Sequence, residues 1–317
     1  MNVKSMNELT PFVTLCITCF NAEDTIARSI RSAQGQDWDN LEILVVDDGS
    51  SDNSCAVVSQ MAEEDKRIRL VRHPKNSGTA VTRSTAMREA KGEFLAFLDD
   101  DDEATPERVA EQVKAILARE SSHQTDLVAC YVSRLVVRPN EPEVYVEAIG
   151  AKGRAPHGKI VADYLLCGEA SDAYDFGEMG SGTMMARTST FRQVGDFDPQ
   201  FRRCAEWDWA VRLAFLGGHF IGCPEPLIRQ HITATPDKSN RKPLDYALLL
   251  RRKHRAYLLR HGEYMKAILS AYLRFHYARG NRLRFRFILA TLFLVSPASV
   301  LRLLKARSNR KTIEGLA

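Results

Sequence analysis

Apolar runs and helix-like periodicities alternate along the first 130 residues of the chain. Apolar positions predict extended strands at residues 12–19, 41–46, 68–72, 93–98 and 127–137. Between them, apolar side chains at helical spacing predict helices at residues 22–34, 54–64, 79–90 and 105–119. This alternation favours an α/β fold, in which a mostly parallel sheet carries helices on both faces.

The pattern changes after residue 137. Residues 138–180 are rich in glycine, proline and charge, so periodicity does not determine their structure. Order returns in residues 181–232, which predict a helix around Glu206-Trp207-Asp208 and a closing pair of strands at 219–223 and 226–231. From residue 243 onward the pattern is helical and basic.

Charge divides the chain into two parts. Residues 1–240 contain 26 Lys and Arg against 37 Asp and Glu, a net charge of −11, whereas residues 241–317 contain 18 against 3, a net charge of +15. We therefore predict a globular region at 1–240, with halves at 11–137 and 138–240, and a basic helical region at 241–317. The acidic body suits cations and the basic tail suits anionic surfaces. A nucleic-acid partner is not expected.

The basic tail contains a 15-residue, mostly apolar segment at 287–301, which Pro297 interrupts. A membrane-spanning helix needs about 20 such residues, so this segment is short for a span. The basic residues around it, within 274–311, favour a helix that lies on an anionic membrane surface. Packing on the globular body and a true span remain as alternatives.

The cysteines and the N-terminus indicate a cytoplasmic protein, peripheral to the membrane if the tail binds lipid. Seven scattered cysteines suit a reducing compartment better than a disulfide framework. Cys16 and Cys19 form a CxxC inside a predicted strand, where buried structural thiols are favoured over a redox or zinc site. The first residues contain no apolar signal-peptide core.

Four consecutive aspartates, Asp99 to Asp102, end the fourth predicted strand. Like charges about 4 Å apart repel by roughly 4 kcal/mol at an effective dielectric constant near 20. A hard divalent cation would relieve this repulsion, because Mg²⁺ commonly takes one or two carboxylates together with substrate phosphates. The alternative is a solvated turn before the helix that Thr105-Pro106 opens, where acidic groups are favourable.

A second acidic pair, Asp47-Asp48, ends the second predicted strand. Ligands of open α/β sheets bind outside the carboxyl ends of the strands. We therefore expect both acidic groups at the same edge of the sheet.

Six short motifs follow one another in a fixed order. They are Thr18-Cys19-Phe20-Asn21, Val46-Asp47-Asp48-Gly49-Ser50, Asn76-Ser77-Gly78 before a helix with Arg83, Phe97-Leu98-Asp99-Asp100-Asp101-Asp102, Gly195-Asp196-Phe197-Asp198 and Glu206-Trp207-Asp208. Together they resemble the inverting glycosyltransferases of glycosyltransferase family 2, which have the GT-A fold. The resemblance covers about residues 11–235.

The resemblance implies a nucleotide-sugar donor site in residues 11–137. The implied donor-binding residues are Cys19, Phe20, Asn21, Asp47, Asp48, Arg83, Asp99 and Asp100. Asp47, and less directly Asp48, would accept a hydrogen bond from the base. Phe20 would stack on the base, with core packing as the alternative. Arg83 would bind the diphosphate, with a solvated helix face as the alternative.

The same resemblance implies a metal ion, Mg²⁺ or Mn²⁺, at the aspartate run. Asp99 and Asp101 match the DxD motif of the family, and Asp101 is the better candidate for direct contact with the metal. The metal would neutralise the diphosphate leaving group. His231 follows the closing strand and is a further candidate contact, although a lone histidine is more often structural.

Glu206 and Asp208 are the candidate catalytic residues. The family commonly has aspartate where this chain has Glu206, and Ala205 replaces a common preceding acid. Either carboxylate can act as a general base. Positions i and i+2 of a helix face different directions, so both cannot address the acceptor equally. We favour Glu206 as the base and Asp208 as a structural partner.

The resemblance implies transfer of a sugar, from a UDP-sugar by preference, to a hydroxyl of a glycan or lipid-linked acceptor in cell-envelope polysaccharide or glycolipid synthesis. The alternative is a nucleotide-sugar-binding or scaffold protein of the same fold that lacks catalysis. A phosphatase is disfavoured because Asp102 and Glu103 follow the DxD, and a dinucleotide-binding dehydrogenase is disfavoured because no GxGxxG follows the first strand.

Overall fold

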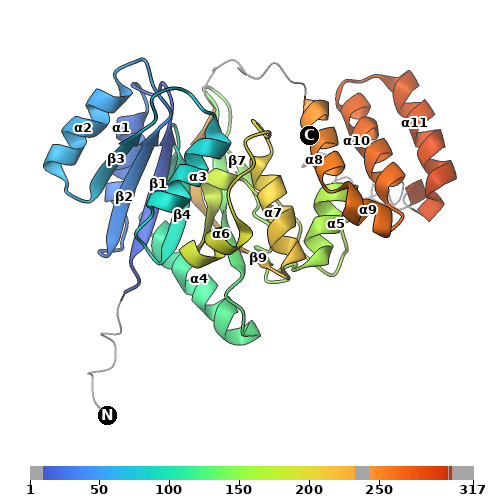
Figure 1. The fold of residues 1–317 in the computed structure, drawn as a ribbon, viewed down its shortest axis with the longest axis horizontal. Coiled ribbons are helices and arrows are strands. Elements are labelled where there is room, and N and C mark those ends of the chain that lie inside the picture. Colours follow the sequence, from blue (N-terminus) through green and yellow to red (C-terminus); the bar gives the residue numbers. More distant parts are fainter. Residues whose placement is uncertain (1–9, 233–242, 299, 302–317) are drawn as a thin grey trace, which may run out of the picture. The chain divides into compact units, whose positions relative to one another are not determined.

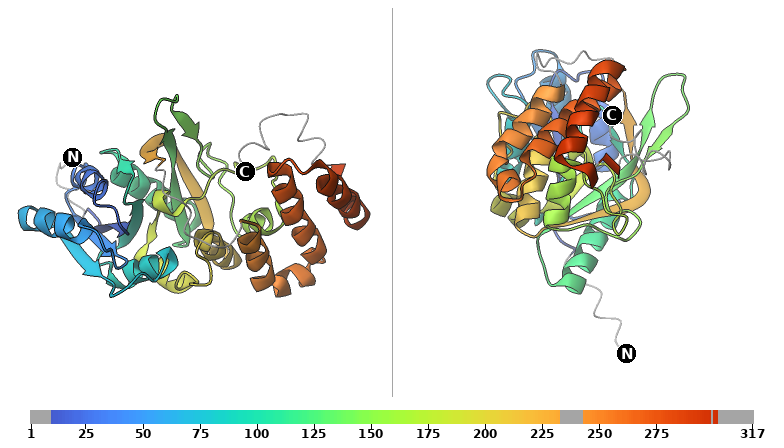
Figure 2. Two further views of the ribbon diagram at one scale, coloured as in Figure 1. Left: turned by 90° about the horizontal axis from the view of Figure 1, so that it is seen from above. Right: turned by 90° about the vertical axis from the view of Figure 1, so that its right-hand side faces the viewer.

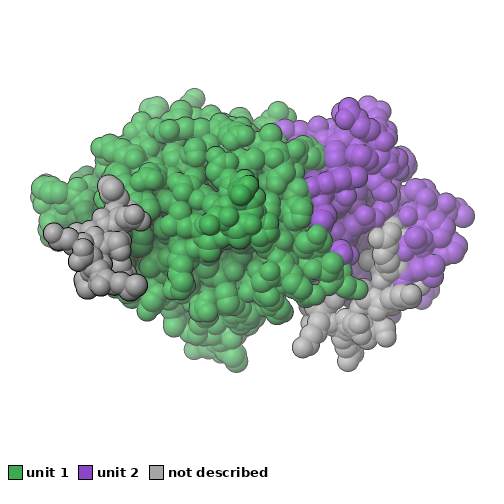
Figure 3. All heavy atoms as spheres, turned by 90° about the horizontal axis from the view of Figure 1, so that it is seen from below, with its two compact units in different colours: residues 1–158, 172–235 green, residues 159–171, 236–317 purple. Residues whose placement is uncertain are grey.

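The computed structural model describes residues 10–232, 243–298, 300 and 301 of the 317-residue chain. The chain divides into two compact units, one of residues 1–158 and 172–235 and one of residues 159–171 and 236–317, which Figure 3 shows in different colours. The predicted boundary at residue 240 lies outside the described residues. Residues 159–171 group with the C-terminal helices, which the sequence did not predict.

The first unit is built on one mixed sheet (Figure 1). The strands of its described part are β1 (Val13–Cys19), β2 (Leu41–Asp47), β3 (Ile68–Arg72), β4 (Phe94–Asp99), β5 (Glu103–Ala104), β6 (Val128–Val137), β7 (Val144–Val146), β8 (Met184–Arg187) and β9 (His219–His231). Their order is β3-β2-β1-β4-β8-β6-β9-β5, with β7 paired to β6. All run in one direction except β5, β7 and β8. The predicted mostly parallel sheet is confirmed.

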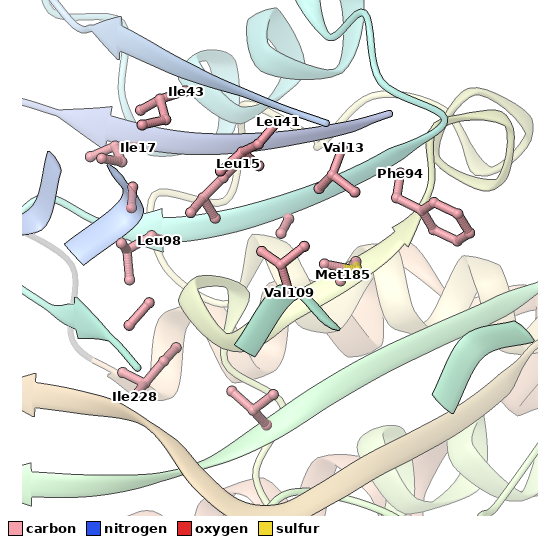
Figure 4. Packing of buried hydrophobic residues seen from close by; sticks show 14 of the residues in the cluster. Val13, Leu15, Ile17, Leu41, Ile43, Phe94, Leu98, Val109, Met185 and Ile228 are labelled. Carbon is pink, nitrogen blue, oxygen red and sulfur yellow. The ribbon is translucent and has the colours of Figure 1, made fainter. Parts of the chain in front are cut away.

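Helices cover both faces of this sheet, as the continuous apolar strands predict. They are α1 (Ile26–Gln34), α2 (Ser54–Glu64), α3 (Thr79–Glu89), α4 (Arg108–His123), α6 (Thr188–Val194) and α7 (Ala205–Phe215), with a 3₁₀ turn η1 (Ser181–Thr183). Alternate β1 residues Val13, Leu15 and Ile17 share one core cluster with α1, α2 and α4 (Figure 4). Phe97 of β4 instead packs against Phe191 of α6, so α6 belongs to the opposite layer.

Two local differences from the predicted elements have a physical cause. The fourth helix begins at Arg108, not at residue 105, because Glu103 and Ala104 pair with Arg229 and Ile228 of β9 as a short strand. The two predicted closing strands form the single strand β9, whose pairing with β6 shifts register near Pro226. Proline has no N–H to donate, so it interrupts the ladder without ending the strand.

The second unit is helical, as predicted for the C-terminal region. It comprises α5 (Lys159–Cys167), α8 (Pro243–Lys253), α9 (Arg255–Arg260), α10 (Tyr264–Ala278) and α11 (Arg282–Val295). Helix α10 packs against α5, α8, α9 and α11, and Figure 2 shows α10 and α11 side by side. The Tyr257 hydroxyl donates to Asp163 Oδ1 at 2.7 Å, which ties α9 to α5. No helix of the described residues is long and apolar enough to span a membrane.

Candidate active site

The carboxyl ends of β1, β2 and β4 meet at one edge of the sheet. In the register of the parallel strands, Cys19 pairs with Asp47 and Thr18 pairs with Asp99. Strands β6 and β9 run in the same direction, so His231 at the end of β9 lies at the same edge. The predicted convergence of the two acidic groups on one edge is confirmed.

Asp47 is buried at this edge beside a pocket of about 470 Å³, which is lined by Gly49, Ser50, Arg72, His73 and Pro74. Its Oδ1 accepts hydrogen bonds from the amides of Gly49 and Ser50 at 3.1 and 3.0 Å. Its Oδ2 accepts none from a nitrogen or oxygen of the described residues, and the neighbouring donor is the weak thiol of Cys55. A buried, unsatisfied carboxylate oxygen favours an N–H donor from a ligand.

Asp48, in contrast, is fully engaged with the protein. Its carboxylate accepts hydrogen bonds from the amides of Ser77 and Gly78, at 2.9 and 2.8 Å, and lies 2.8 Å from His73 Nδ1. It therefore anchors the loop between β3 and α3. Gly49 allows that loop to approach, because a Cβ at this position would lie 2.6 Å from the backbone of Lys75.

The three candidate donor-binding residues at the end of β1 place different groups at this edge of the sheet. The Cys19 thiol lies in the core cluster, and burial raises its pKa well above the ordinary range, so only the Cys19 backbone lies at the edge. Phe20 is partly buried, and its amide donates to Asp100 Oδ2 at 2.9 Å. Asn21 adopts a positive φ of 52°, and its Oδ1 accepts a hydrogen bond from the Ser51 amide. Asn21 thus ties the ends of β1 and β2 together.

The side chains of the four aspartates, Asp99 to Asp102, have different partners. Asp100 accepts the Phe20 amide, and Asp102 Oδ1 accepts the His231 amide at 3.0 Å. Burial and the charges of neighbouring aspartates raise the pKa of Asp100 to about 7 and the pKa of Asp102 to about 8. Asp100 and Asp102 therefore brace the loop against β1 and β9. By exposure, Asp99, Asp100 and Asp101 are partly exposed and Asp102 is buried.

Asp99 lies between groups from two other segments, α3 and η1. Its Oδ1 lies 3.4 Å from an Nη of Arg83, which α3 contributes and which is nearly buried. On the other side it faces Gly182 of η1. The guanidinium of Arg108, which is fully buried, joins β4 to η1. It donates to the carbonyls of Phe97 and Gly182 at 2.6 and 3.0 Å. Neither Gly182 nor Arg108 was predicted from the sequence, because both act through backbone contacts between distant segments.

Gly182→Ala is expected to displace the Asp99 carboxylate without unfolding the protein. A Cβ at this position would lie 2.7 Å from Asp99 Oδ2, and the end of that side chain can move. Donor binding should weaken by roughly tenfold, equivalent to about one displaced charged hydrogen bond, while the melting temperature stays within a few degrees. Gly180→Ala is the matched control, because its Cβ would meet only ordinary contacts near 3.9 Å. Equal donor affinity in both variants, measured by calorimetry, would contradict this role.

Glu206 lies in the first turn of α7, and the charges of Arg83 and Asp99 both act on it. The pKa of Glu206 is raised above its ordinary value, chiefly by burial. The charge of Arg83 lowers this pKa, and the charges of Asp99 and Glu178 raise it. The buried Tyr131 hydroxyl also lies near Glu206: it has no hydrogen-bond partner among the described residues, and burial followed by the Glu206 charge raises its pKa. Tyr131 was missed from the sequence, since it comes from a strand without a motif.

Asp208 forms an ion pair with Arg212, a partly exposed arginine of the same helix. Its Oδ2 accepts from Arg212 Nε at 3.0 Å, and Asp208 is fully buried. Arg212 also donates to the carbonyls of Val194 and Asp196, at 2.6 and 2.7 Å. The pair therefore holds the loop that carries Gly195-Asp196-Phe197-Asp198.

His231 lies beside the aspartate run, and one of its two ring nitrogens already contacts Glu103. Its Nε2 lies 2.7 Å from Glu103 Oε1, so a metal or phosphate contact would need the other ring nitrogen. Within residues 10–232 and 243–301, residue 299 apart, no group of three His, Cys, Asp or Glu side chains is arranged to hold a metal ion alone. Two carboxylates, Asp99 and Asp101, still fit a cation that takes its other ligands from a diphosphate. Burial first, and then the charges of Asp99 and Asp101, raise the pKa of Asp100 and of Asp102, so negative charge is concentrated at this loop.

Comparison with known proteins agrees with this geometry. Residues 14–149 match the profile of Glycosyl transferase family 2. The chain carries a glycosyltransferase family 2 domain. The curated relatives include the putative glycosyltransferase EpsH of Bacillus subtilis, 35% identical over 121 residues, which are 38% of this chain and 33% of EpsH. The glucosyltransferase WfgD of Escherichia coli is 39% identical over 105 residues, which are 33% of this chain and 41% of WfgD.

The matched segment spans about a third to a half of the length of these relatives. WfgD is described as a UDP-Glc:GlcNAc-diphosphoundecaprenol glucosyltransferase, and its acceptor is therefore a lipid-linked sugar. Among solved structures, Staphylococcus aureus TarS 1–349 in complex with UDP-GlcNAc superposes with a TM-score of 0.62, covering 96% of this chain and 89% of that chain at 17% identity. This likeness confirms the GT-A fold of the family 2 domain.

Proposed function

We propose that the protein is an inverting glycosyltransferase that moves a sugar from a nucleotide diphosphate to a hydroxyl of a glycan or lipid-linked acceptor. The convergence of Glu206, Arg83 and Asp99 on the carboxyl edge of the sheet carries this proposal. A carboxyl group with a raised pKa, beside a fixed guanidinium, combines a proton acceptor with a group that binds phosphate oxygens.

The donor base occupies the pocket beside Asp47. The unsatisfied Asp47 Oδ2 accepts an N–H of the base, and the ring N–H of uracil is one such donor. Phe20, partly buried at the end of β1, stacks on the ring. Asp48 and Asn21 hold the loops that shape this pocket and make no contact with the base themselves. A UDP-sugar also agrees with the UDP-Glc of WfgD and the UDP-GlcNAc of the TarS complex.

The diphosphate lies between Arg83 and the aspartate run. Asp101 and Asp99 would hold a Mg²⁺ or Mn²⁺ ion, which would supply positive charge against the leaving diphosphate. Arg83 orients the diphosphate with its guanidinium fork. Asp100 and Asp102 keep the loop in place through the amides of Phe20 and His231. His231 buttresses the loop through Glu103.

Glu206 accepts the proton of the acceptor hydroxyl. The acceptor oxygen then forms its bond to the anomeric carbon while the bond from that carbon to the diphosphate oxygen breaks, so the configuration inverts. Asp208 does not touch the reacting atoms; it positions α7 and the preceding loop through Arg212.

The acceptor is proposed from the relatives and from the basic tail. WfgD and a Campylobacter jejuni relative are described as acting on undecaprenol-linked sugars. We infer a lipid-linked acceptor in envelope polysaccharide synthesis, reached at the cytoplasmic face of the membrane through residues 274–311. The odd number of scattered cysteines is in keeping with that compartment.

A screen of nucleotide-sugars tests the proposal. The purified full chain is incubated with UDP-, GDP- and CMP-sugars, with Mg²⁺, with Mn²⁺ or with a chelator, and both binding and sugar release are measured. Metal-dependent binding of a UDP-sugar with slow release of the sugar supports the transferase. Binding without release, and without transfer to a lipid-linked sugar, would favour the alternative of a donor-binding scaffold. Failure to bind any of these sugars would contradict both.

A further inference from the structure

Helix α11 is apolar on two opposite faces. Its inner face, represented by Phe285, Ile288 and Leu292, packs with Leu269 and Leu273 of α10 in a small core. This packing accounts for one apolar face of α11. The other face has no covering element among the described residues.

The outer face forms a continuous ridge, which we define as Leu283, Phe287, Ala290 and Leu294. These positions follow the i, i+4, i+7, i+11 spacing of a single helical stripe. The exposed fractions of Leu283, Phe287 and Leu294 are 82, 76 and 83%. Single exposed apolar residues are ordinary, but large apolar side chains aligned on one helix face mark a surface that binds something apolar.

Arginines flank this ridge without acidic neighbours. Arg282, Arg284 and Arg286 are all exposed, and none forms an ion pair with a described residue. Helix α11 contains no acidic residue, and residues 264–313 of the sequence contain none either. The partner that covers the ridge must therefore supply both apolar surface and negative charge.

We propose that the ridge of α11 docks on an anionic phospholipid surface, with the arginines on the lipid phosphates. Leucine and phenylalanine enter the boundary between headgroups and acyl chains, and the 14-residue helix lies in the plane of that boundary. A second copy of the chain fits less well, because a two-fold contact would bring the same arginines of both copies together. The proposal rests on the membrane contact proposed above for residues 274–311 and names the helix face and the lipid that make it; it does not depend on the transfer step.

Flotation with vesicles tests this surface. The full chain should float with vesicles of phosphatidylcholine and phosphatidylglycerol, much less with phosphatidylcholine alone, and less as salt is raised. Phe287→Ser combined with Leu294→Ser should lower the vesicle partition coefficient by roughly tenfold or more, since both side chains leave water on docking. Leu259→Ser is the control, because Leu259 of α9 is exposed by 52% but lies off the ridge.

The charged flank is tested separately. Arg282→Gln with Arg286→Gln should weaken binding to anionic vesicles by about fivefold for each charge. Arg252→Gln with Arg260→Gln, two exposed arginines of other helices, is the matched pair.

Equal flotation of the ridge variant and the native chain would overturn the proposal. So would ridge-dependent dimerisation without any vesicle binding, observed by light scattering. The ridge variants should transfer sugar to a short soluble acceptor as the native chain does. Failure of the membrane proposal can therefore be told apart from failure of the transferase proposal.

Discussion

Glu206→Gln is expected to lower the rate of sugar transfer by roughly 10²–10⁴-fold, the range for loss of a general base. Donor binding should remain, because the amide keeps the size of the carboxyl group and Arg83 and Asp101 are untouched. The measurement is kcat for transfer, together with calorimetric binding of the UDP-sugar. Full residual transfer in Glu206→Gln would refute the assignment.

The pH profile gives a second test of Glu206. Burial and the charges of Asp99 and Glu178 raise its pKa above the ordinary range of glutamate. The base form therefore accumulates only as pH rises through that raised pKa, so the acid limb of the profile should lie above the ordinary glutamate pKa and disappear in Glu206→Gln. A profile flat through this region in the native enzyme would contradict the role.

Stability separates Glu206 from Asp208. A raised pKa means that the folded state favours the protonated form, so the stabilising contribution is lost as pH rises through the folded pKa. Glu206→Gln should therefore leave the melting temperature at neutral pH unchanged or higher. Asp208→Asn should lower the free energy of unfolding by roughly 1–3 kcal/mol, because it breaks the ion pair of the buried Asp208 with Arg212. Its effect on kcat should be smaller than that of Glu206→Gln.

Asp101→Ala is expected to remove most of the metal-dependent part of donor binding. Asp101 is partly exposed and is the proposed metal contact because it matches the second acid of the DxD motif. Affinity for the UDP-sugar with Mg²⁺ or Mn²⁺ should fall by roughly tenfold or more, and affinity in the presence of a chelator should not change. Calorimetry with and without metal measures both quantities.

Asp24→Asn is the control for this variant, since Asp24 is an exposed aspartate outside the loop. Asp99→Asn tests the second proposed ligand and should also weaken binding without metal, because Asp99 contacts Arg83. If Asp101→Ala retains the native metal dependence while Asp99→Asn loses it, the metal contact belongs to Asp99 and not to Asp101.

The sequence by itself determined the layered α/β fold and the edge at which the chemistry lies. Strand length, apolar runs and the alternation with helices are local properties, and the rule that ligands bind at carboxyl ends of strands then brings Asp47 and Asp99 together. The register of β1 with β2 and β4 agrees with that expectation. The order of short motifs was also sufficient to identify the family.

Only the tertiary structure decided which carboxylates are turned inward. Neighbouring aspartates in one loop have the same local sequence environment, so their directions depend on donors from distant segments. Asp100 is turned by an amide 80 residues away and Asp102 by one 129 residues away. Asp48 and Asp208 are likewise committed to partners outside their own motifs, and Gly182 and Tyr131 enter the site from segments without a recognisable pattern. Side-chain direction in a loop follows from long-range hydrogen bonds and burial, which local periodicity does not encode.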